Sequence, residues 1–171
     1  MRGEGGFYTF RGYSLMDLKR TDALSPSMED YLEMLYRLCR GSGYTRLLEL
    51  AEALHVQPPS ASRMVQKLSE DGFVQYEKYG VIKLTEQGLA RGRDLIERHE
   101  MLMRFFAFLG VSSPLEDTEK VEHSLSEDAI SGMKKLLDFV SRHPEIAGVW
   151  REYLKPAARM SKENEDQGQS R

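Results

Sequence analysis

Apolar residues recur every three or four positions in several separate stretches of the chain, a spacing that predicts helices with one buried face. The first stretch begins at Ser25-Pro26, where a serine N-cap and a proline at the first helical position favour a helix start, and it ends near Gly41-Ser-Gly43. The same spacing predicts further helices over 45–54, 60–69, 85–109, 119–123 and 127–140, with one or two more turns over 145–155. Asp117 or Thr118 is the expected cap of the helix over 119–123.

Residues 73–79 and 81–84 have a different pattern, because β-branched and aromatic residues dominate both segments and Gly80 lies between them. This pattern predicts two short strands joined by a turn. The helices over 45–54 and 60–69 are separated by a short proline-containing interruption, which is the layout of a helix-turn-helix. A two-stranded ribbon directly after these helices predicts a winged helix-turn-helix.

The second helix of this predicted motif has a polar face without an acidic residue before Leu68. Its candidate DNA-binding residues are Ser60, Ser62, Arg63, Gln66 and Lys67. Arg63 and Gln66 suit guanine or adenine edges, while the serines and the lysine suit the phosphate backbone. Lys78 and Tyr79 stand at the expected tip of the wing, within reach of a phosphate or the minor groove. An ordinary solvated helix face is the alternative interpretation.

Glu119, Glu122 and His123 have the spacing of metal ligands on a helix. Residues at i, i+3 and i+4 share one helical face, so two carboxylates and an imidazole would converge on one point. Three ligands alone would leave a divalent ion half exposed, so the site needs further residues from elsewhere in the chain.

Asp30 and Glu33 form a second candidate pair, at i and i+3 on the first predicted helix, and His99 lies in the middle of the helix over 85–109. Acids near a helix N-terminus also suit the helix dipole, and a lone helical histidine is more often a surface or core residue than a ligand. The hypothesis is that all six residues meet in one metal site. Four carboxylates and two imidazoles form the hard, oxygen-rich set that Mn²⁺ favours.

The composition limits the other possibilities. The chain has 171 residues, 40% of them hydrophobic, and a net charge of −3, so DNA binding must depend on local patches. The single cysteine, Cys39, lies in an apolar helical pattern and has no partner for an internal disulfide. No run approaches the 18 apolar residues of a membrane span, and the N-terminus lacks an apolar signal region, so the expected location is the cytoplasm, with no membrane partner.

Six short motifs between Ser25 and Val140 carry a resemblance to a known family. They are Ser27-Met-Glu-Asp30-Tyr-Leu-Glu33, Ala51-Glu-Ala-Leu54, Met64-Val-Gln-Lys-Leu68, Tyr76-Glu-Lys-Tyr79, Arg98-His99-Glu100 and Glu119-Lys-Val-Glu122-His123. With these motifs the chain resembles the manganese-sensing branch of the diphtheria toxin repressor (DtxR) family. The iron-sensing branch has methionine in place of Asp30 and cysteine in place of Glu119.

The resemblance implies a homodimer that binds pseudo-palindromic operator DNA and represses metal-uptake genes when Mn²⁺ is plentiful. It implies that the metal ligands are Asp30, Glu33, His99, Glu119, Glu122 and His123. Six ligands are enough for two Mn²⁺ ions per subunit, with Glu122 as the bridge that the family implies. Fe²⁺, Co²⁺ or Cd²⁺ are the expected substitutes for Mn²⁺.

The expected fold is therefore mostly α: an N-terminal winged helix-turn-helix domain with a small two-stranded wing, followed by an all-α dimerisation domain. The expected boundaries are a flexible extension over 1–24, the DNA-binding domain over 25–92, the metal-binding and dimerisation domain over 93–143, and a partly disordered C-terminal extension over 144–171. Apolar surface left on the last helices suggests that they form the dimer interface.

The sequence leaves three other functions to consider. A di-iron enzyme needs paired Glu-x-x-His motifs, but Ile96 and Lys120 occupy the glutamate positions before the two histidines, and no His-Glu-x-x-His metalloprotease motif is present. An enzyme is therefore not expected. An iron-responsive repressor of the same family is the main alternative, and a metal-independent winged-helix regulator is a further one.

Overall fold

The computed structural model describes residues 24–77 and 80–155, which divide into two compact units. Unit 1 ends at Glu97 and unit 2 begins at Arg98. This boundary lies inside the long helix α5, Glu86–Leu109, which therefore belongs to both units.

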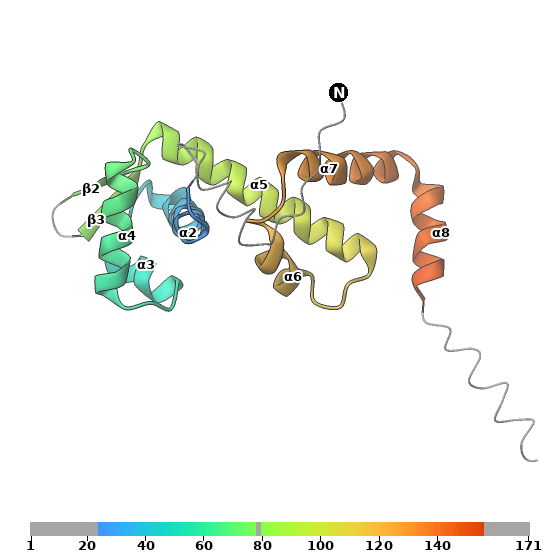
Figure 1. The fold of residues 1–171 in the computed structure, drawn as a ribbon, viewed down its shortest axis with the longest axis horizontal. Coiled ribbons are helices and arrows are strands. Elements are labelled where there is room, and N and C mark those ends of the chain that lie inside the picture. Colours follow the sequence, from blue (N-terminus) through green and yellow to red (C-terminus); the bar gives the residue numbers. More distant parts are fainter. Residues whose placement is uncertain (1–23, 78–79, 156–171) are drawn as a thin grey trace, which may run out of the picture. The chain divides into compact units, whose positions relative to one another are not determined.

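Unit 1 combines helices with a small antiparallel sheet (Figure 1). In chain order its elements are α2 (Pro26–Ser42), β1 (Thr45–Arg46), α3 (Leu47–Ala53), α4 (Pro58–Glu70), β2 (Val74–Tyr76), β3 (Val81–Leu84) and the first half of α5. Helices α3 and α4 pack on each other and on α2, which is the helix-turn-helix that the sequence predicted. His55, in the turn between them, has a φ of 53°, a left-handed conformation that few residues other than glycine adopt.

The prediction of a helix over 45–54 was wrong at its start. Thr45 and Arg46 form β1, which pairs with Ile82 and Val81 of β3, so the sheet has three strands in the order β1-β3-β2. The carboxylate of Glu49 explains the late helix start: it accepts hydrogen bonds from the Thr45 hydroxyl (2.7 Å) and the Arg46 amide (3.1 Å). A glutamate at the third helical position that accepts a hydrogen bond from the N-cap amide fixes the helix start, here at Leu47.

The other elements of unit 1 lie close to the predicted ones, except that β2 covers only Val74–Tyr76 where a strand over 73–79 was predicted. Helix α2 starts after Ser25 and ends at Ser42, and Gly43 is its C-cap, with a φ of 78° that suits glycine, although the Ser25 side chain makes no capping hydrogen bond. Helix α4 begins at Pro58, two residues before the predicted start, because both prolines fit its first turn. The apolar faces of these helices and of the sheet share one core: Met28, Tyr31, Leu32, Leu35, Leu50, Ala51, Ala61, Val65, Leu68, Phe73, Val74, Ile82 and Leu95.

Unit 2 consists of the second half of α5 followed by α6 (Pro114–Val121), α7 (Glu127–Arg142) and α8 (Pro144–Leu154). Helix α6 starts at Pro114, so the expected cap at Asp117 or Thr118 was wrong; Asp117 instead lies in the acidic first turn, where it suits the helix dipole. Helix α6 also ends earlier than predicted, at Val121, so Glu122 is its C-cap and His123 lies in the following turn.

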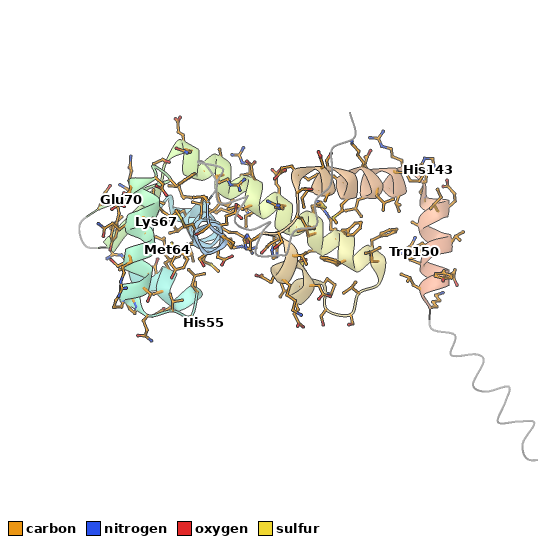
Figure 2. All side chains as sticks on the ribbon, viewed as in Figure 1. His55, Met64, Lys67, Glu70, His143 and Trp150 are labelled. Atoms are coloured by element: carbon orange, nitrogen blue, oxygen red, sulfur yellow. The ribbon has the colours of Figure 1, made fainter. Side chains whose placement is uncertain are left out.

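The core of unit 2 is small and lies between α5 and α7, with Met101, Leu102 and Ile130 at its centre. Helix α8 attaches to the end of α5 through Trp150, which donates a hydrogen bond to the carbonyl oxygen of Phe108 (2.7 Å). Figure 2 labels Trp150 on α8 and His143 at its junction with α7.

The expected fold class is confirmed, with the third strand as an addition. The sequence expectations for residues 1–23, and for 156–171 at the end of the C-terminal extension, lie outside the described residues. No helix within the described ranges is both long and apolar enough to span a membrane.

Replacing Gly88 by alanine should lower the free energy of unfolding by about 1–3 kcal/mol, the usual cost of overpacking. A Cβ at this position would lie 2.0 Å from the carbonyl oxygen of Phe73, so the start of α5 would have to move away from the sheet. Gly132→Ala in α7 is the matched control, because its Cβ would meet nothing within 4 Å. Urea denaturation should show the control as stable as the wild type or more stable by about 0.5–1 kcal/mol. Equal effects of the two substitutions would contradict this packing argument.

Candidate metal centre and DNA-binding surface

A buried histidine–carboxylate pair lies at the centre of the candidate metal residues of unit 2. The Nδ1 atom of His99, on α5, is 2.9 Å from the Oε2 atom of Glu122, at the end of α6. His99 is 7% exposed and Glu122 is 5% exposed. A carboxylate is rarely buried this deeply unless it is paired or binds a metal ion, and here His99 is its buried partner.

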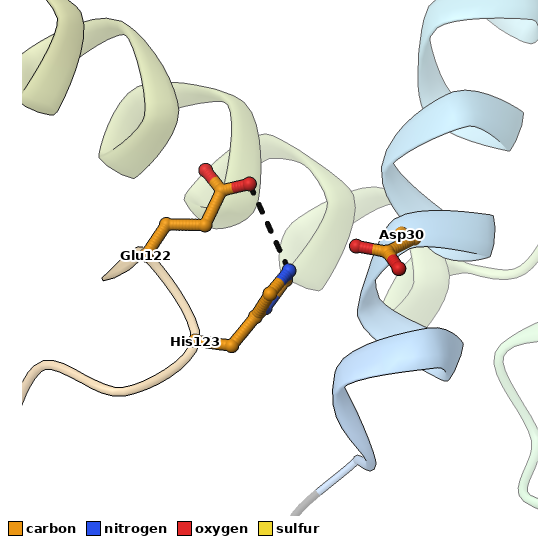
Figure 3. Close-up of side chains that lie close together, drawn as sticks. All are labelled: Asp30, Glu122 and His123. Carbon is orange, nitrogen blue, oxygen red and sulfur yellow. Dashed lines mark ion pairs between the residues drawn. The ribbon is translucent and has the colours of Figure 1, made fainter. Parts of the chain in front are cut away.

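The second oxygen of the same carboxylate faces His123. Nε2 of His123 is 3.7 Å from Oε1 of Glu122, the contact drawn as a dashed line in Figure 3. Glu122 therefore lies between two imidazoles, one at each oxygen. The turn after α6 makes this possible, since Glu122 keeps helical backbone angles while His123 is already outside the helix.

Glu119 lies on α6, one helical turn before Glu122, and its side chain is exposed. Positions three apart share a helical face, so Glu119 extends the same row of donors toward solvent. Unit 2 thus brings His99, Glu122 and His123 into contact and places Glu119 beside them in the chain.

Unit 1 carries the other two candidate ligands on α2. The apolar positions of this helix, such as Leu32 and Leu35, face the core, and Asp30 and Glu33 lie away from it at i and i+3. Asp30, labelled in Figure 3, is exposed. The Glu33 carboxylate accepts hydrogen bonds from the Arg37 guanidinium at 2.6 and 3.1 Å, a pair at i, i+4 that was not predicted from the sequence.

The only cysteine of the chain does not belong to this donor set. Cys39 is 5% exposed and lies in unit 1, with its Sγ 4.0 Å from the carbonyl oxygen of Ile82. Burial, and secondarily the charge of Glu49, raises the pKa of the Cys39 thiol, which keeps it protonated. The candidate donors are therefore carboxylates and imidazoles, which fit a hard divalent ion such as Mn²⁺.

Two further arginines, neither of them among the predicted site residues, contact the segments that carry the candidate ligands. Arg91 pairs with the buried Glu29, next to Asp30 in the chain. Arg98 binds the turn that follows His123. The only indication in the sequence is that Arg98 directly precedes His99, and this does not identify Leu125 or Glu29 as a partner of either arginine.

The candidate DNA-binding surface lies on α4. Ala61, Val65 and Leu68 face the core of unit 1, so the opposite face of the helix is open to solvent. Ser60, Arg63, Gln66 and Lys67 are exposed there, and Lys67 is labelled on α4 in Figure 2. Glu70 follows at the end of the helix, beyond this face.

Ser62 differs from the other candidates on α4. Its Oγ is 3.5 Å from the hydroxyl of Tyr76 on β2, and the side chain is partly buried, so it ties α4 to the sheet. The two wing candidates, Lys78 and Tyr79, lie outside the described residues.

The chain matches two domain models of one known family, one for a DNA-binding domain and one for a metal-binding domain. Residues 23–82 match the model of the N-terminal DNA-binding domain of iron-dependent repressors, and residues 85–151 match the model of the metal-binding and dimerisation domain of the same family. An HTH-type transcriptional regulator MntR from Lysinibacillus sphaericus is 41% identical over 124 residues, covering 71% of this chain and 89% of the relative. The chain belongs to the iron-dependent repressor family.

A further relative and two solved structures are also similar to most of this chain. MntR of Geobacillus kaustophilus is 44% identical over 117 residues, which cover 67% of this chain and 83% of the relative. Among solved structures, the manganese regulator SloR matches with a TM-score of 0.58 at 27% identity over 68% of this chain, and ScaR with bound Zn²⁺ matches with 0.56 at 30% over 66%. The chain spans about half the length of these two structures, 55% and 54%.

The family consists of transcriptional regulators and not of enzymes. Its first domain binds DNA, and its second binds a metal and dimerises. A divalent-metal-dependent, dimeric DNA-binding protein is therefore the class to which this chain belongs.

Proposed function

We propose that this protein is a Mn²⁺-activated repressor of metal-uptake genes, which binds pseudo-palindromic operator DNA as a homodimer in the cytoplasm. The observation that carries the proposal is the buried Glu122 carboxylate between His99 and His123. It lies in the part of the chain that matches a metal-binding domain. The MntR relatives give the proposal its choice of metal.

The proposed ligands are Asp30, Glu33, His99, Glu119, Glu122 and His123. Four of them are carboxylates, which favour Mn²⁺ over softer ions, while Zn²⁺ and Cu²⁺ must be excluded by geometry and by supply because they bind most such sites more tightly. The two oxygens of Glu122 face different imidazoles, which supports a bridging role and two ions per subunit. Fe²⁺, Co²⁺ and Cd²⁺ are the substitutes expected to fit the same donors.

Activation would follow from the connection between the ligands and the DNA-binding helices. A bound ion supplies coordination bonds that link ligands from different helices. Asp30 and Glu33 lie on α2, and α2 packs directly on α4 through the core of unit 1. Fixing α2 therefore fixes α4, the proposed reading helix. A coupling free energy of roughly 1–3 kcal/mol is typical of such linkage.

The iron-responsive alternative is less well supported by the donor atoms. Sulfur ligands favour transition-metal ions that come later in the series than Mn²⁺. Positions 30 and 119 hold carboxylates here, and the cysteine of the chain is buried in the core of unit 1 and not beside the candidate ligands. The donor set is therefore harder than a site with methionine and cysteine.

The proposed dimer interface lies on α7 and α8. Exposed apolar side chains gather there: Leu136 (42% exposed), Phe139 (46%), Ile146 (40%), Val149 (72%) and Tyr153 (79%). Helix α8 also lines an open apolar cavity of about 600 Å³ with Glu145, Ile146, Val149, Trp150 and Tyr153. Apolar surface of this extent is typical of association sites, and the family's second domain dimerises.

The main prediction is metal-dependent DNA binding. Duplexes selected from a random library in the presence of Mn²⁺ should bind the dimer roughly 5- to 150-fold more tightly with Mn²⁺ than with a chelator. Half-sites should be one helical turn apart or a multiple of it. Fluorescence anisotropy at matched free Mn²⁺ and anaerobic Fe²⁺ separates the manganese and iron hypotheses. Equal affinity with Mn²⁺ and with chelator would reject the manganese hypothesis, and equal affinity with Fe²⁺ and with chelator would reject the iron hypothesis.

A second prediction concerns the reading helix. Arg63→Ala and Gln66→Ala should relax sequence preference, each costing on the order of 1–3 kcal/mol if the side chain binds a base edge in bidentate fashion. Lys67→Ala should weaken binding to all duplexes and reduce the salt slope by about 1, as expected for one lost phosphate contact. Ranking a set of operator variants with each mutant is the measurement. An unchanged ranking for Arg63→Ala would assign Arg63 to the phosphate backbone.

A third prediction tests the dimer interface. Val149→Glu places a charge on the apolar face of α8, so it should shift the protein toward monomer in sedimentation velocity at micromolar concentration. Operator affinity should fall with it, because a monomer binds only one half-site. Glu152→Gln, on an exposed position of the same helix, is the control and should stay dimeric. If Val149→Glu remained a dimer, the interface would have to lie elsewhere.

A further inference from the structure

Arg98 makes a contact that the proposed metal chemistry does not use. It directly precedes His99 on α5, and its side chain is only 13% exposed. Its Nη2 donates a hydrogen bond of 2.6 Å to the carbonyl oxygen of Leu125, and its Nη1 is 3.6 Å from a carboxylate oxygen of Glu127. All these residues lie in unit 2.

Of these two partners, Leu125 belongs to the short connection between α6 and α7, and Glu127 is the first residue of α7. This connection carries Glu122 and His123 at its start. Its start is fixed by backbone hydrogen bonds from Glu122 N to Thr118 O (2.9 Å) and from Ser124 N to Val121 O (2.9 Å). Its far end is fixed by Arg98 at Leu125 and by the Ser126 side chain, which caps α7 by accepting a hydrogen bond from the Ala129 amide (3.2 Å).

The same turn of α5 therefore holds the connection at two points. His99 contacts Glu122, and its neighbour Arg98 contacts Leu125, three residues further along. We propose that Arg98 is a positioning residue, which holds the α6–α7 connection so that Glu122 and His123 keep their places beside His99 before a metal ion binds. This inference rests on the proposed function for its consequence, a higher metal affinity.

The chemistry of the contact favours this role over a generic surface tie. A hydrogen bond from a charged guanidinium is stronger than one between neutral groups, and a carbonyl oxygen that has lost its solvent needs such a donor. Within the described part of the chain, the Nε atom of Arg98 is buried without a hydrogen-bond partner. The side chain thus gives up solvation at Nε while its Nη2 atom binds the connection at Leu125. Glu127 contributes little, because it is 81% exposed and screened by water.

Arg98→Met tests the proposal, since it keeps an unbranched apolar stem and removes the guanidinium. Loss of a residue that orients metal ligands typically weakens metal binding 10- to 100-fold, and this is the expected effect on the Mn²⁺ dissociation constant, measured by competition with a chelating dye. Arg98→Lys, which can still donate to Leu125, should recover part of the loss. Arg104→Met is the matched control, an exposed arginine on the same helix, and should bind Mn²⁺ like the wild type.

A second measurement, on the metal-free protein, separates positioning from mere stability. The ¹⁵N chemical shifts of the His99 ring report its hydrogen bond to Glu122. Arg98→Met should alter them while thermal unfolding shows that the variant remains folded; if it does not fold, the same shifts are read in Arg98→Lys. Unchanged His99 shifts, or Mn²⁺ affinity within twofold of the wild type, would overturn the proposal. A wild type that binds no Mn²⁺ would instead contradict the proposed function, and the metal-free shifts would still decide the role of Arg98.

Discussion

The candidate site of unit 2 depends on the burial of one carboxylate, that of Glu122. Removing a carboxylate from water costs several kcal/mol unless other groups compensate. Here the compensation comes from two imidazoles, His99 at one oxygen and His123 at the other. These contacts join α5 to the end of α6 and to the turn after it. The interactions that make the buried charge tolerable therefore also hold three candidate metal ligands together, and a site assembled in advance binds its ion with less reorganisation.

Helix α5 contacts both segments that carry candidate ligands, α2 in unit 1 and the Glu122 turn in unit 2. In unit 1, Arg91 pairs with Glu29 of α2, and Gly92 lets the Tyr36 side chain approach so closely that a Cβ there would lie 2.7 Å from it. In unit 2, Arg98 and His99 hold the connection after α6. One continuous helix thus provides the support for α2 and for the Glu122 turn. Mutations on this helix are expected to affect metal binding even where they touch no ligand.

Much of the fold was predictable because local signals and the hydrophobic pattern agree. Pro26, Gly43 and the apolar stripe define α2 without any tertiary information. The strand at Thr45 was not predictable, because its pairing with Ile82 is a contact between residues distant in sequence. The candidate ligands were found from helical spacing and resemblance. However, His123 lies beyond the end of α6, so its contact with Glu122 comes from a turn and not from the helical face that the spacing suggested.

Two of the candidate carboxylates are paired with side chains of their own unit, and these pairs bear on how metal binding would affect the protein. Glu33 is paired with Arg37, and Glu122 is paired with His99. A metal ion held by these residues would therefore compete with Arg37 and His99 for the same carboxylate oxygens. Because the ligands must be deprotonated and their existing contacts given up, only the difference between the two sets of contacts is left to act on the DNA-binding helices. This explains why a few kcal/mol of coupling, and not the whole binding free energy of the metal, is the amount to expect.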